Sequence, residues 1–162
     1  MAYIPVRFDG ACKTRRLVLL DVENVVGGAL QRAEELDRAL LALSDIVGDL
    51  RGAETHLVIG CGTQSLRAIA GAPKVGRVVF GAGLDGADRA LLDVMITEKV
   101  AQRYAEIVLV SGDGIFAGAL AQLSGSTTRT VVVADARRLS RKLRMAAGSW
   151  WPLASGPMGL AA

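Results

Sequence analysis

Residues 106–123 read EIVLVSGDGIFAGALAQL and contain the clearest strand-to-helix junction of the chain. Their apolar run, Ile107–Val110, ends directly in Ser-Gly-Asp-Gly, and a helix-like pattern follows. This order is typical of a buried strand that turns into a helix in an α/β protein. It places the carboxylate of Asp113 at the C-terminal end of a strand and beside the start of a helix.

The same alternation of strand-like and helix-like segments extends in both directions from this junction. The predicted strands are Leu17–Val22, Thr55–Ile59, Arg77–Phe80, Ile107–Val110 and Thr130–Val133, and the predicted helices are Ala29–Leu50, Gln64–Ala70, Ala87–Arg103, Phe116–Leu123 and Leu139–Ala147. The strand runs are almost continuously apolar, as expected for strands buried on both faces of a parallel sheet. We therefore expect an α/β protein, a three-layer α/β/α sandwich with a mostly parallel central sheet of five or six strands.

The end of the chain adds one further apolar group, Trp150, Trp151 and Leu153. It forms either a short last strand or a patch that packs against a helix, and we favour packing. A length of 162 residues indicates one domain. We place this domain at residues 15–153, between an N-terminal tail (1–14) and a C-terminal tail (154–162).

The composition excludes several classes of protein. Apolar residues make up 51% of the chain and charged residues 22%, which indicates a globular protein rather than a disordered one. No segment has the roughly 18 uninterrupted apolar residues of a membrane span, and the N-terminus lacks a signal-peptide pattern. We therefore expect no membrane partner and a cytoplasmic location. The net charge of +3 is compatible with a nucleic-acid partner but is weak evidence for one.

Cysteine and histidine are too few for the common catalytic and zinc sites. The two cysteines, Cys12 and Cys61, are far apart and are expected to be free thiols, and His56 is the only histidine. This argues against a zinc site and against a triad built on two or more histidines. We expect His56, which opens a predicted strand, to be a packing or edge residue.

Carboxylates follow three of the strand-to-helix junctions. Asp21 ends the first predicted strand, Asp88 opens the helix after the third, and Asp113 follows the fourth. In an open α/β sheet, ligands bind outside the carboxyl ends of the strands, where these side chains can meet in one cleft. Carboxylates, with an amide such as Asn24, suit Mg²⁺ or Mn²⁺. Such an ion neutralises a phosphodiester and activates a water molecule for attack.

Each acidic residue also has a simpler explanation. Asp88 is well placed as an acid in the first turn of a helix, and Asp113 as an ordinary turn residue. Glu23 is expected to alternate away from Asp21 and to lie behind the site or face solvent. Asp85 is an alternative to Asp88, whereas Asp93 lies about 140° around the helix from Asp88 and is a weaker candidate.

In these segments the chain resembles the NYN domain family, a branch of the PIN-like metal-dependent ribonucleases. The similar segments are LVLLDVENVVGG (17–28), GADRALLDVM (86–95), VLVSGDGIFAGAL (108–120) and TVVVADARRLSRKLRMAAGSWW (130–151). Together they extend from about Leu17 to Leu153 and imply a PIN-like, Rossmann-like fold. The resemblance implies an endoribonuclease that hydrolyses RNA phosphodiester bonds with a metal-activated water. It also implies metal binding and catalysis by Asp21, Asp88 and Asp113 with Mg²⁺ or Mn²⁺, and supporting roles for Asn24 and Ser111.

One position departs from the family pattern. Where the family often has a second aspartate two residues after the first, this chain has Ile115. The alternative to a nuclease is therefore a catalytically weakened NYN module that binds RNA or regulates. A phosphohydrolase of the haloacid dehalogenase kind is a third hypothesis, based on Asp21-Val22-Glu23, although no catalytic lysine motif follows.

Basic residues near the C-terminus are candidates for RNA contacts. On a helix whose buried stripe is Leu139 and Leu143, the basic residues would form an outer face that follows phosphates, or an ordinary solvated face. The candidates are Arg137, Arg138, Arg141, Lys142 and Arg144, with Arg89 nearer the metal. A homodimer is also considered, with candidate interface residues Leu84, Ile115, Trp150 and Trp151.

Overall fold

The computed structural model describes residues 14–72 and 74–154. The predicted tails lie outside these ranges except for Thr14 and Ala154, and Cys12 also lies outside them. No helix within the described ranges is long and apolar enough to cross a membrane.

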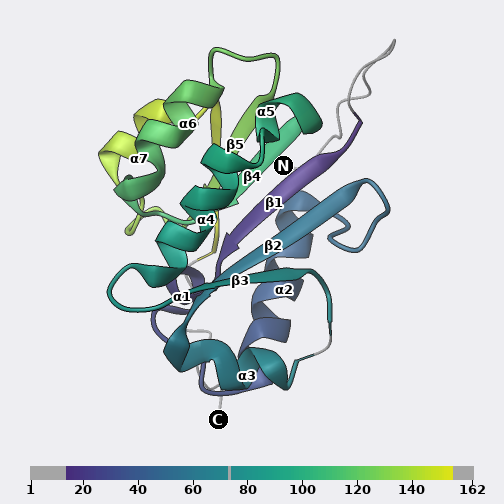
Figure 1. The fold of residues 1–162 in the computed structure, drawn as a ribbon, viewed down its shortest axis with the longest axis vertical. Helices are drawn as coiled ribbons and strands as arrows, with labels where there is room; N and C mark the ends of the chain where they lie inside the picture. Colours follow the sequence, from purple (N-terminus) through teal and green to yellow (C-terminus); the bar gives the residue numbers. More distant parts are fainter. Residues whose placement is uncertain (1–13, 73, 155–162) are drawn as a thin grey trace.

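A central sheet of six parallel strands organises the molecule (Figure 1). The strands are β1 (Arg16–Asp21), β2 (Thr55–Gly62), β3 (Arg77–Gly81), β4 (Glu106–Val110), β5 (Arg129–Ala134) and β6 (Ser149–Pro152). Their order across the sheet is β3-β2-β1-β4-β5-β6. The chain thus builds outward from β1 in one direction and from β4 in the other. The predicted α/β sandwich is confirmed, and the sheet is parallel throughout.

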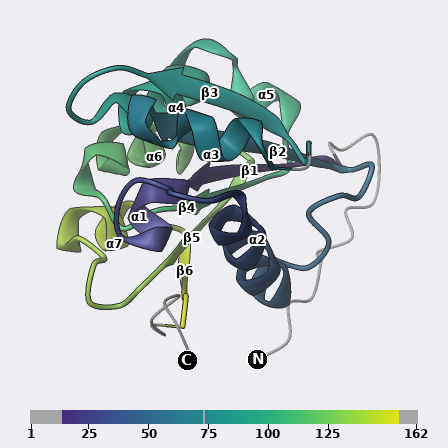
Figure 2. The same ribbon diagram turned by 90° about the horizontal axis from the view of Figure 1, so that it is seen from below.

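Helices cover both faces of the sheet and enclose two separate hydrophobic cores. Figure 2 shows α2 on one side of the strands and α4, α5 and α6 on the other. The first core lies under α1 (Val22–Val26), α2 (Ala33–Val47) and α3 (Leu66–Ala70). The second lies under α4 (Gly86–Thr97), α5 (Val100–Arg103), α6 (Ala117–Leu123) and α7 (Arg141–Ala146). Two short 3₁₀ turns, η1 (Thr63–Ser65) and η2 (Gly114–Phe116), precede α3 and α6.

Several predicted boundaries were wrong. Val22 begins α1 instead of ending the first strand, because the carboxylate of Asp21 caps a helix there. The helix predicted for Ala29–Leu50 is shorter, at Ala33–Val47. The helix predicted for Ala87–Arg103 is divided in two at Lys99, whose φ of 51° is left-handed and interrupts the helical backbone.

The edge strand β3 differs from what the apolar pattern predicted, whereas the edge strand β6 combines both alternatives given for the last apolar group. Strand β3 pairs only with β2, and Val78 and Phe80 are 41% and 51% exposed, so the expected burial on both faces was wrong for this strand. The last apolar group does form a strand, β6, and its tryptophans also pack as predicted. Trp151 packs against the first core and Trp150 against the second, one on each face of the sheet.

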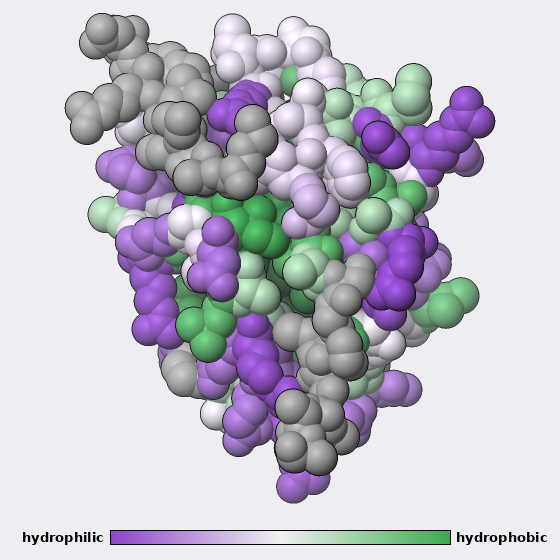
Figure 3. All heavy atoms as spheres, turned by 180° about the vertical axis from the view of Figure 1, so that it is seen from behind, coloured by the Kyte–Doolittle hydropathy of each residue, from purple (hydrophilic) through white to green (hydrophobic). Residues whose placement is uncertain are grey.

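The surface view from behind Figure 1 shows hydrophobic residues near the middle of that face and hydrophilic residues around them (Figure 3). Exposed hydrophobic side chains occur on several elements, including Leu41 on α2 and Leu84 in the loop before α4. Nothing in the structure shows a second copy of the chain, so the homodimer stays a prediction.

A contact between two glycines places the start of α4 against the end of β3. A Cβ atom on Gly81 would overlap the backbone of Gly86, and one on Gly86 would overlap the backbone of Gly81. Neither obstacle is a flexible side chain. This contact fixes where α4 starts, two residues before Asp88.

We expect Gly81→Ala to lower the free energy of unfolding by about 1–3 kcal/mol, the usual cost of overfilling a packed site. Gly118→Ala is the matched control, because a Cβ atom on Gly118, which lies in α6, would meet no other atom within 4 Å. That control should stabilise the protein by about 0.5–1 kcal/mol, as alanine does in a helix. Urea unfolding measures both, and equal effects would contradict the proposed contact.

Candidate functional site

Asp21 is the centre of the candidate site. It is the last residue of β1, which lies next to β4 at the point where the strand order reverses. Asp21 is only 3% exposed. Its Oδ1 accepts a hydrogen bond from the backbone N–H of Asn24 at 3.1 Å, and its Oδ2 accepts one from the hydroxyl of Ser111 at 2.8 Å. Open α/β sheets bind ligands at such a reversal of strand order.

The loop after β4 is held against α1 by side chains of the site. The amide oxygen of Asn24 accepts a hydrogen bond from the backbone N–H of Gly112 at 3.0 Å. The hydroxyl of Ser111, which is fully buried, accepts one from the N–H of Asp113 at 3.2 Å. The predicted supporting residues Asn24 and Ser111 thus join the ends of β1 and β4.

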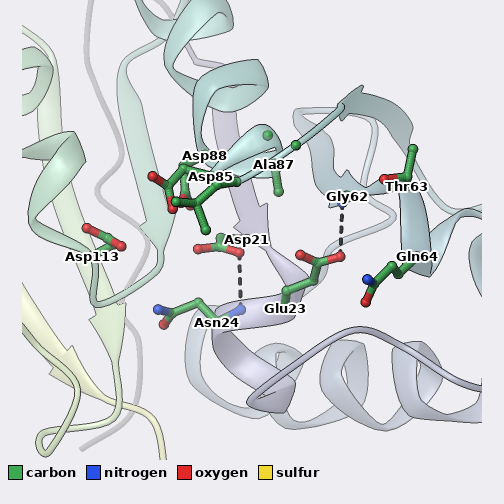
Figure 4. Close-up of a pocket in the computed structure, with 13 residues that line it drawn as sticks. Asp21, Glu23, Asn24, Gly62, Thr63, Gln64, Asp85, Ala87, Asp88 and Asp113 are labelled. Carbon is green, nitrogen blue, oxygen red and sulfur yellow. Dashed lines mark hydrogen bonds between the residues drawn. The ribbon is translucent and has the colours of Figure 1, made fainter.

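A cavity of about 500 Å³ opens in front of Asp21 (Figure 4). The predicted residues Asp21, Asp88 and Asp113 all line it, together with Asn24. They come from β1, α4 and the loop after β4, so the structure brings together side chains that are far apart in the sequence. The complete lining is Asp21, Glu23, Asn24, Gly62, Thr63, Gln64, Gly83, Leu84, Asp85, Gly86, Ala87, Asp88 and Asp113.

The carboxyl groups of Asp21 and Asp88 line the same cavity, and the pKa of each is raised. Burial, together with the neighbouring carboxylate of Asp21 and the charges of Asp113 and Asp85, raises the pKa of Asp88 to about 8. Burial also raises the pKa of Asp21, against the lowering effect of its hydrogen bonds from Asn24 and Ser111. Without a cation, the two groups therefore favour the protonated form more than ordinary aspartates do.

The donor set suits a cation that keeps much of its own water. No group of three His, Cys, Asp or Glu side chains within the described ranges is arranged to hold a metal ion together. Asp113 is exposed, and its Oδ1 accepts a hydrogen bond from the N–H of Ile115 at 2.9 Å. Mg²⁺ is usually bound by one or two carboxylates and completes its shell with water and substrate phosphate. Asp21 and Asp88, which line the same cavity, fit that requirement.

Glu23 was wrongly predicted to lie behind the site or face solvent. It lines the cavity, and its Oε1 accepts hydrogen bonds from the N–H of Gly62 at 2.9 Å and from the hydroxyl of Ser65 at 2.5 Å. The alternation used for the prediction applies only to a strand, and β1 ends at Asp21. Asp21 is the N-cap of α1, and aspartate is a preferred N-cap residue. Recognising a helix start at Asp21 would have predicted that Glu23 lies on a helix rather than on a strand.

The other acidic candidates are on or beyond the rim. Asp85 is exposed and lines the cavity from the residue before α4, where its φ of 56° is left-handed. Asp93 is exposed and does not line the cavity, in agreement with its weaker candidacy.

The basic residues near the C-terminus do not share one helix face, which corrects that prediction. Helix α7 begins at Arg141, so Arg137 and Arg138 lie in the loop before it. The side chain of Arg137 forms an ion pair with Asp135 at 3.2 Å. The hydroxyl of Ser140 caps α7 by accepting a hydrogen bond from the N–H of Leu143, so the helix begins only after Ser140.

Arg138 is the basic residue of this group that contacts α1, the helix that carries Asn24. Its guanidinium donates a hydrogen bond to the backbone carbonyl of Asn24 at 2.9 Å. Within α7, Arg141, Lys142 and Arg144 are exposed, and the guanidinium of Arg144 lies 5.0 Å from the ring centre of Trp150. Arg89 is also exposed, beside Asp88 on α4, and does not line the cavity.

Neither the thiol nor the imidazole of the described chain belongs to the site. Cys61 is buried, and burial raises the pKa of its thiol to about 11, so it is a poor nucleophile. His56 Nδ1 lies 2.8 Å from the hydroxyl of Tyr104 in a hydrogen-bonded pair, which is a packing role as predicted.

Fold and site together define a Rossmann-like α/β protein with an acidic cleft at the reversal of strand order. No protein-family model matches the chain, and no curated protein matches it significantly. Among solved structures it is similar to a protein of unknown function from Vibrio parahaemolyticus, with a TM-score of 0.58 and 16% identity. The match covers 91% of this chain and 98% of that protein, and it supports the fold alone.

Proposed function

We propose that this protein is a Mg²⁺- or Mn²⁺-dependent endoribonuclease of the NYN, PIN-like kind. The observation that carries the proposal is that Asp21, Asp88 and Asp113 all line one cleft at the carboxyl ends of β1 and β4. Carboxyl groups brought together in this way, with raised pKa values for Asp21 and Asp88, mark a place that favours positive charge. The sequence resemblance in the segments around Asp21, Asp88 and Asp113 supports the same function.

The residues of the site have distinct roles in this proposal. Asp21 and Asp88 hold the cation, which when bound neutralises phosphate charge and lowers the pKa of water. Asn24 and Ser111 keep Asp21 and the loop after β4 in place through their hydrogen bonds. Asp113 lines the exposed side of the cavity and would bind the cation or a water beside the phosphate. Its Oδ1 accepts a capping hydrogen bond from the N–H of Ile115, which leaves Oδ2 for that role.

RNA is the proposed polymer because one basic side chain contacts α1 and further basic side chains are exposed on α7. Arg138 is hydrogen-bonded to α1, and Arg141, Lys142 and Arg144 follow it on exposed positions of α7. Positive side chains of this kind bind phosphates without reading sequence. Since aromatic residues are only 4% of the chain, extensive base stacking is not expected.

A catalytically weakened RNA-binding module is the second candidate. It is favoured by the absence, within the described ranges, of a preassembled group of three metal-ligating side chains, and by Ile115 in place of an acid. Ile115 is 38% exposed and does not line the cavity. This candidate predicts salt-sensitive RNA binding that persists in Asp21→Asn and needs no divalent cation.

The proposal is tested with end-labelled single-stranded RNAs of mixed sequence, in Mn²⁺ and in EDTA. We expect cleavage in Mn²⁺ only, and we expect Asp113→Asn to slow it by about 10–100-fold, as loss of a group that orients a metal site does. Asp93→Asn is the matched control, because Asp93 is an exposed aspartate on α4 outside the cavity. Absence of cleavage in the wild-type protein, with metal-independent RNA binding, would favour the second candidate instead.

A further inference from the structure

Strand β3 forms an uncovered edge of the sheet. It pairs with β2 on one side, and no strand among residues 14–72 and 74–154 pairs with its other side. Figure 2 shows it as the outermost strand, beyond β2 and β1. The outer side of such a strand carries backbone N–H and C=O groups that have no strand partner and can pair with a strand of another chain.

The opposite edge of the sheet is protected, whereas β3 is not. Strand β6 ends in Pro152, which has no N–H to donate to a neighbouring strand. Strand β3 reads Arg-Val-Val-Phe-Gly, with no proline and with a single charge at its first position. Two of its hydrophobic side chains, Val78 and Phe80, are exposed. Since edge strands that stay unpaired usually carry charges or proline, this composition favours association.

The two exposed side chains lie on one face of the sheet, beyond the first core. Val78 is in register with Ile59 of β2. Phe80 is in register with Cys61, which belongs to the first core, as Ile59 does. Val79 points to the other face and packs against the second core. Val78 and Phe80 therefore continue the apolar face of the sheet outward, to where no described helix buries them.

The sequence of β3 is complementary to itself in the antiparallel direction. When two copies pair around a twofold axis at Val79, Val78 of each copy lies directly opposite Phe80 of the other. Both pairs lie on the same exposed face, and a β-branched residue opposite an aromatic one is a favourable cross-strand pair. Val79 lies opposite itself, so either hydrogen-bonding phase of an antiparallel ladder is compatible with this register.

The same register brings opposite charges together. The residue opposite Gly81 is Arg77 of the other copy, on the face of the sheet that α4 covers. Gly81 has no side chain, and the backbone of Gly86, at the start of α4, lies against it. Asp85 is exposed and directly precedes Gly86. Arg77 forms an ion pair with Glu98 of its own chain at 2.6 Å through one nitrogen, and a guanidinium has further donors for Asp85 of the other copy.

We infer that this protein forms a symmetric dimer through antiparallel pairing of β3 with β3 of a second copy. The two sheets become one continuous sheet, and the twofold axis makes the contact closed, as in most homodimers. The carboxyl ends of the two sets of strands point in opposite directions, so the two acidic clefts stay separate. A strand of five residues makes a small interface, which predicts a weak dimer. The inference is independent of the proposed nuclease activity.

Sedimentation of the full chain at concentrations from about 5 to 500 µM, a range that suits small interfaces, measures the association. We expect the weight-average mass to rise with concentration towards twice that of one chain. Phe80→Lys removes the aromatic member of both cross-strand pairs and should keep the protein monomeric throughout, because lysine on an edge strand opposes pairing. Met145→Lys is the matched control, since Met145 is an exposed hydrophobic residue on α7, and it should associate like the wild-type protein.

Disulfide formation tests the register, in a Cys12→Ser background oxidised with diamide. A mixture of Val78→Cys and Phe80→Cys chains should form the mixed disulfide, because directly opposite residues lie within the Cα separation of about 4.4–6.8 Å that disulfides need. Either variant alone should cross-link about tenfold more slowly, since its cysteines are then diagonal neighbours about 7–8 Å apart.

Three results would overturn the inference. The first is a wild-type protein that stays monomeric at every concentration. The second is association that persists in Phe80→Lys, or that is lost equally in Met145→Lys. The third is equal cross-linking in the mixture and in the single variants, which would mean that β3 does not pair around Val79. None of these measurements involves RNA or a metal ion, so they leave the test of the nuclease unaffected.

Discussion

Asp21→Asn is expected to abolish Mn²⁺-dependent RNA cleavage and to weaken Mn²⁺ binding by at least about 100-fold. This loss exceeds the effect of removing a residue that only orients a metal ligand, which is about 10–100-fold. The carboxylate of Asp21 is buried and lines the same cavity as Asp88, so its charge acts on the cavity with little screening. An amide has no such charge. Calorimetric titration with Mn²⁺ and a cleavage assay on the same preparation measure the two effects.

The fold should survive this substitution. Asparagine caps a helix as well as aspartate does, so its oxygen can still accept from the N–H of Asn24. The substitution also removes the repulsion that raises the pKa of Asp88. We therefore expect Asp21→Asn to unfold at the same or a higher urea concentration than the wild-type protein in the absence of metal.

Asp21→Ala is the contrasting variant. Alanine leaves the N–H of Asn24 without its cap and the buried hydroxyl of Ser111 without its acceptor. The expected loss is about 1–3 kcal/mol in the free energy of unfolding. If Asp21→Asn cleaved RNA as fast as the wild-type protein, the assignment of the site to Asp21 would be wrong.

The sheet was predictable because its strands carry their own signal. The runs that end at Asp21 and at Val110 are apolar on both faces, which fits only the middle of a covered sheet. The carboxylates could be placed in one cleft for the same reason, since the carboxyl ends of parallel strands share an edge. That argument could not supply the distances between the carboxylates. Asp113 lines the cavity, but among the described residues it does not form a preassembled group of three metal ligands with the other carboxylates.

The errors arose where tertiary contacts decide the local structure. Glu23 was misplaced because the chain changes from strand to helix at Asp21, so that a strand period no longer applies. Arg138 was assigned to a helix, but its loop is held by a hydrogen bond to Asn24, more than a hundred residues earlier in the chain. Contacts over such separations leave no periodic pattern in the sequence.

The acidic cleft gives the metal-free protein an unusual dependence on pH. In the fold, Asp88 keeps its proton up to a pH of about 8, whereas in the unfolded chain it loses that proton near the ordinary aspartate pKa of 3.8. Between these values the folded state binds more protons than the unfolded state, so the contribution of Asp88 to stability falls as the pH rises. It is fully present below about pH 4 and is lost above about pH 8.

Mn²⁺ should reverse this dependence, which is the second large effect. A cation competes with the proton for Asp21 and Asp88, and therefore binds more tightly at pH 8 than at pH 6. At a concentration about 100 times its Kd at pH 8, the ion should stabilise the fold by about 2.7 kcal/mol. For a chain of 162 residues this corresponds to a rise in Tm of about 5–11 °C.

Thermal unfolding at pH 6 and pH 8, with and without Mn²⁺ at constant ionic strength, measures the effect. Asp88→Asn is the decisive control, because the difference in Tm between this variant and the wild-type protein gives the contribution of Asp88 separately from that of the other carboxylates. In this variant the stabilisation by Mn²⁺ should largely disappear, and so should the part of the pH dependence described above. A rise in Tm that is the same at both pH values, or that persists in Asp88→Asn, would mean that the ion binds elsewhere. The raised pKa values of Asp21 and Asp88 would then be only a consequence of their burial.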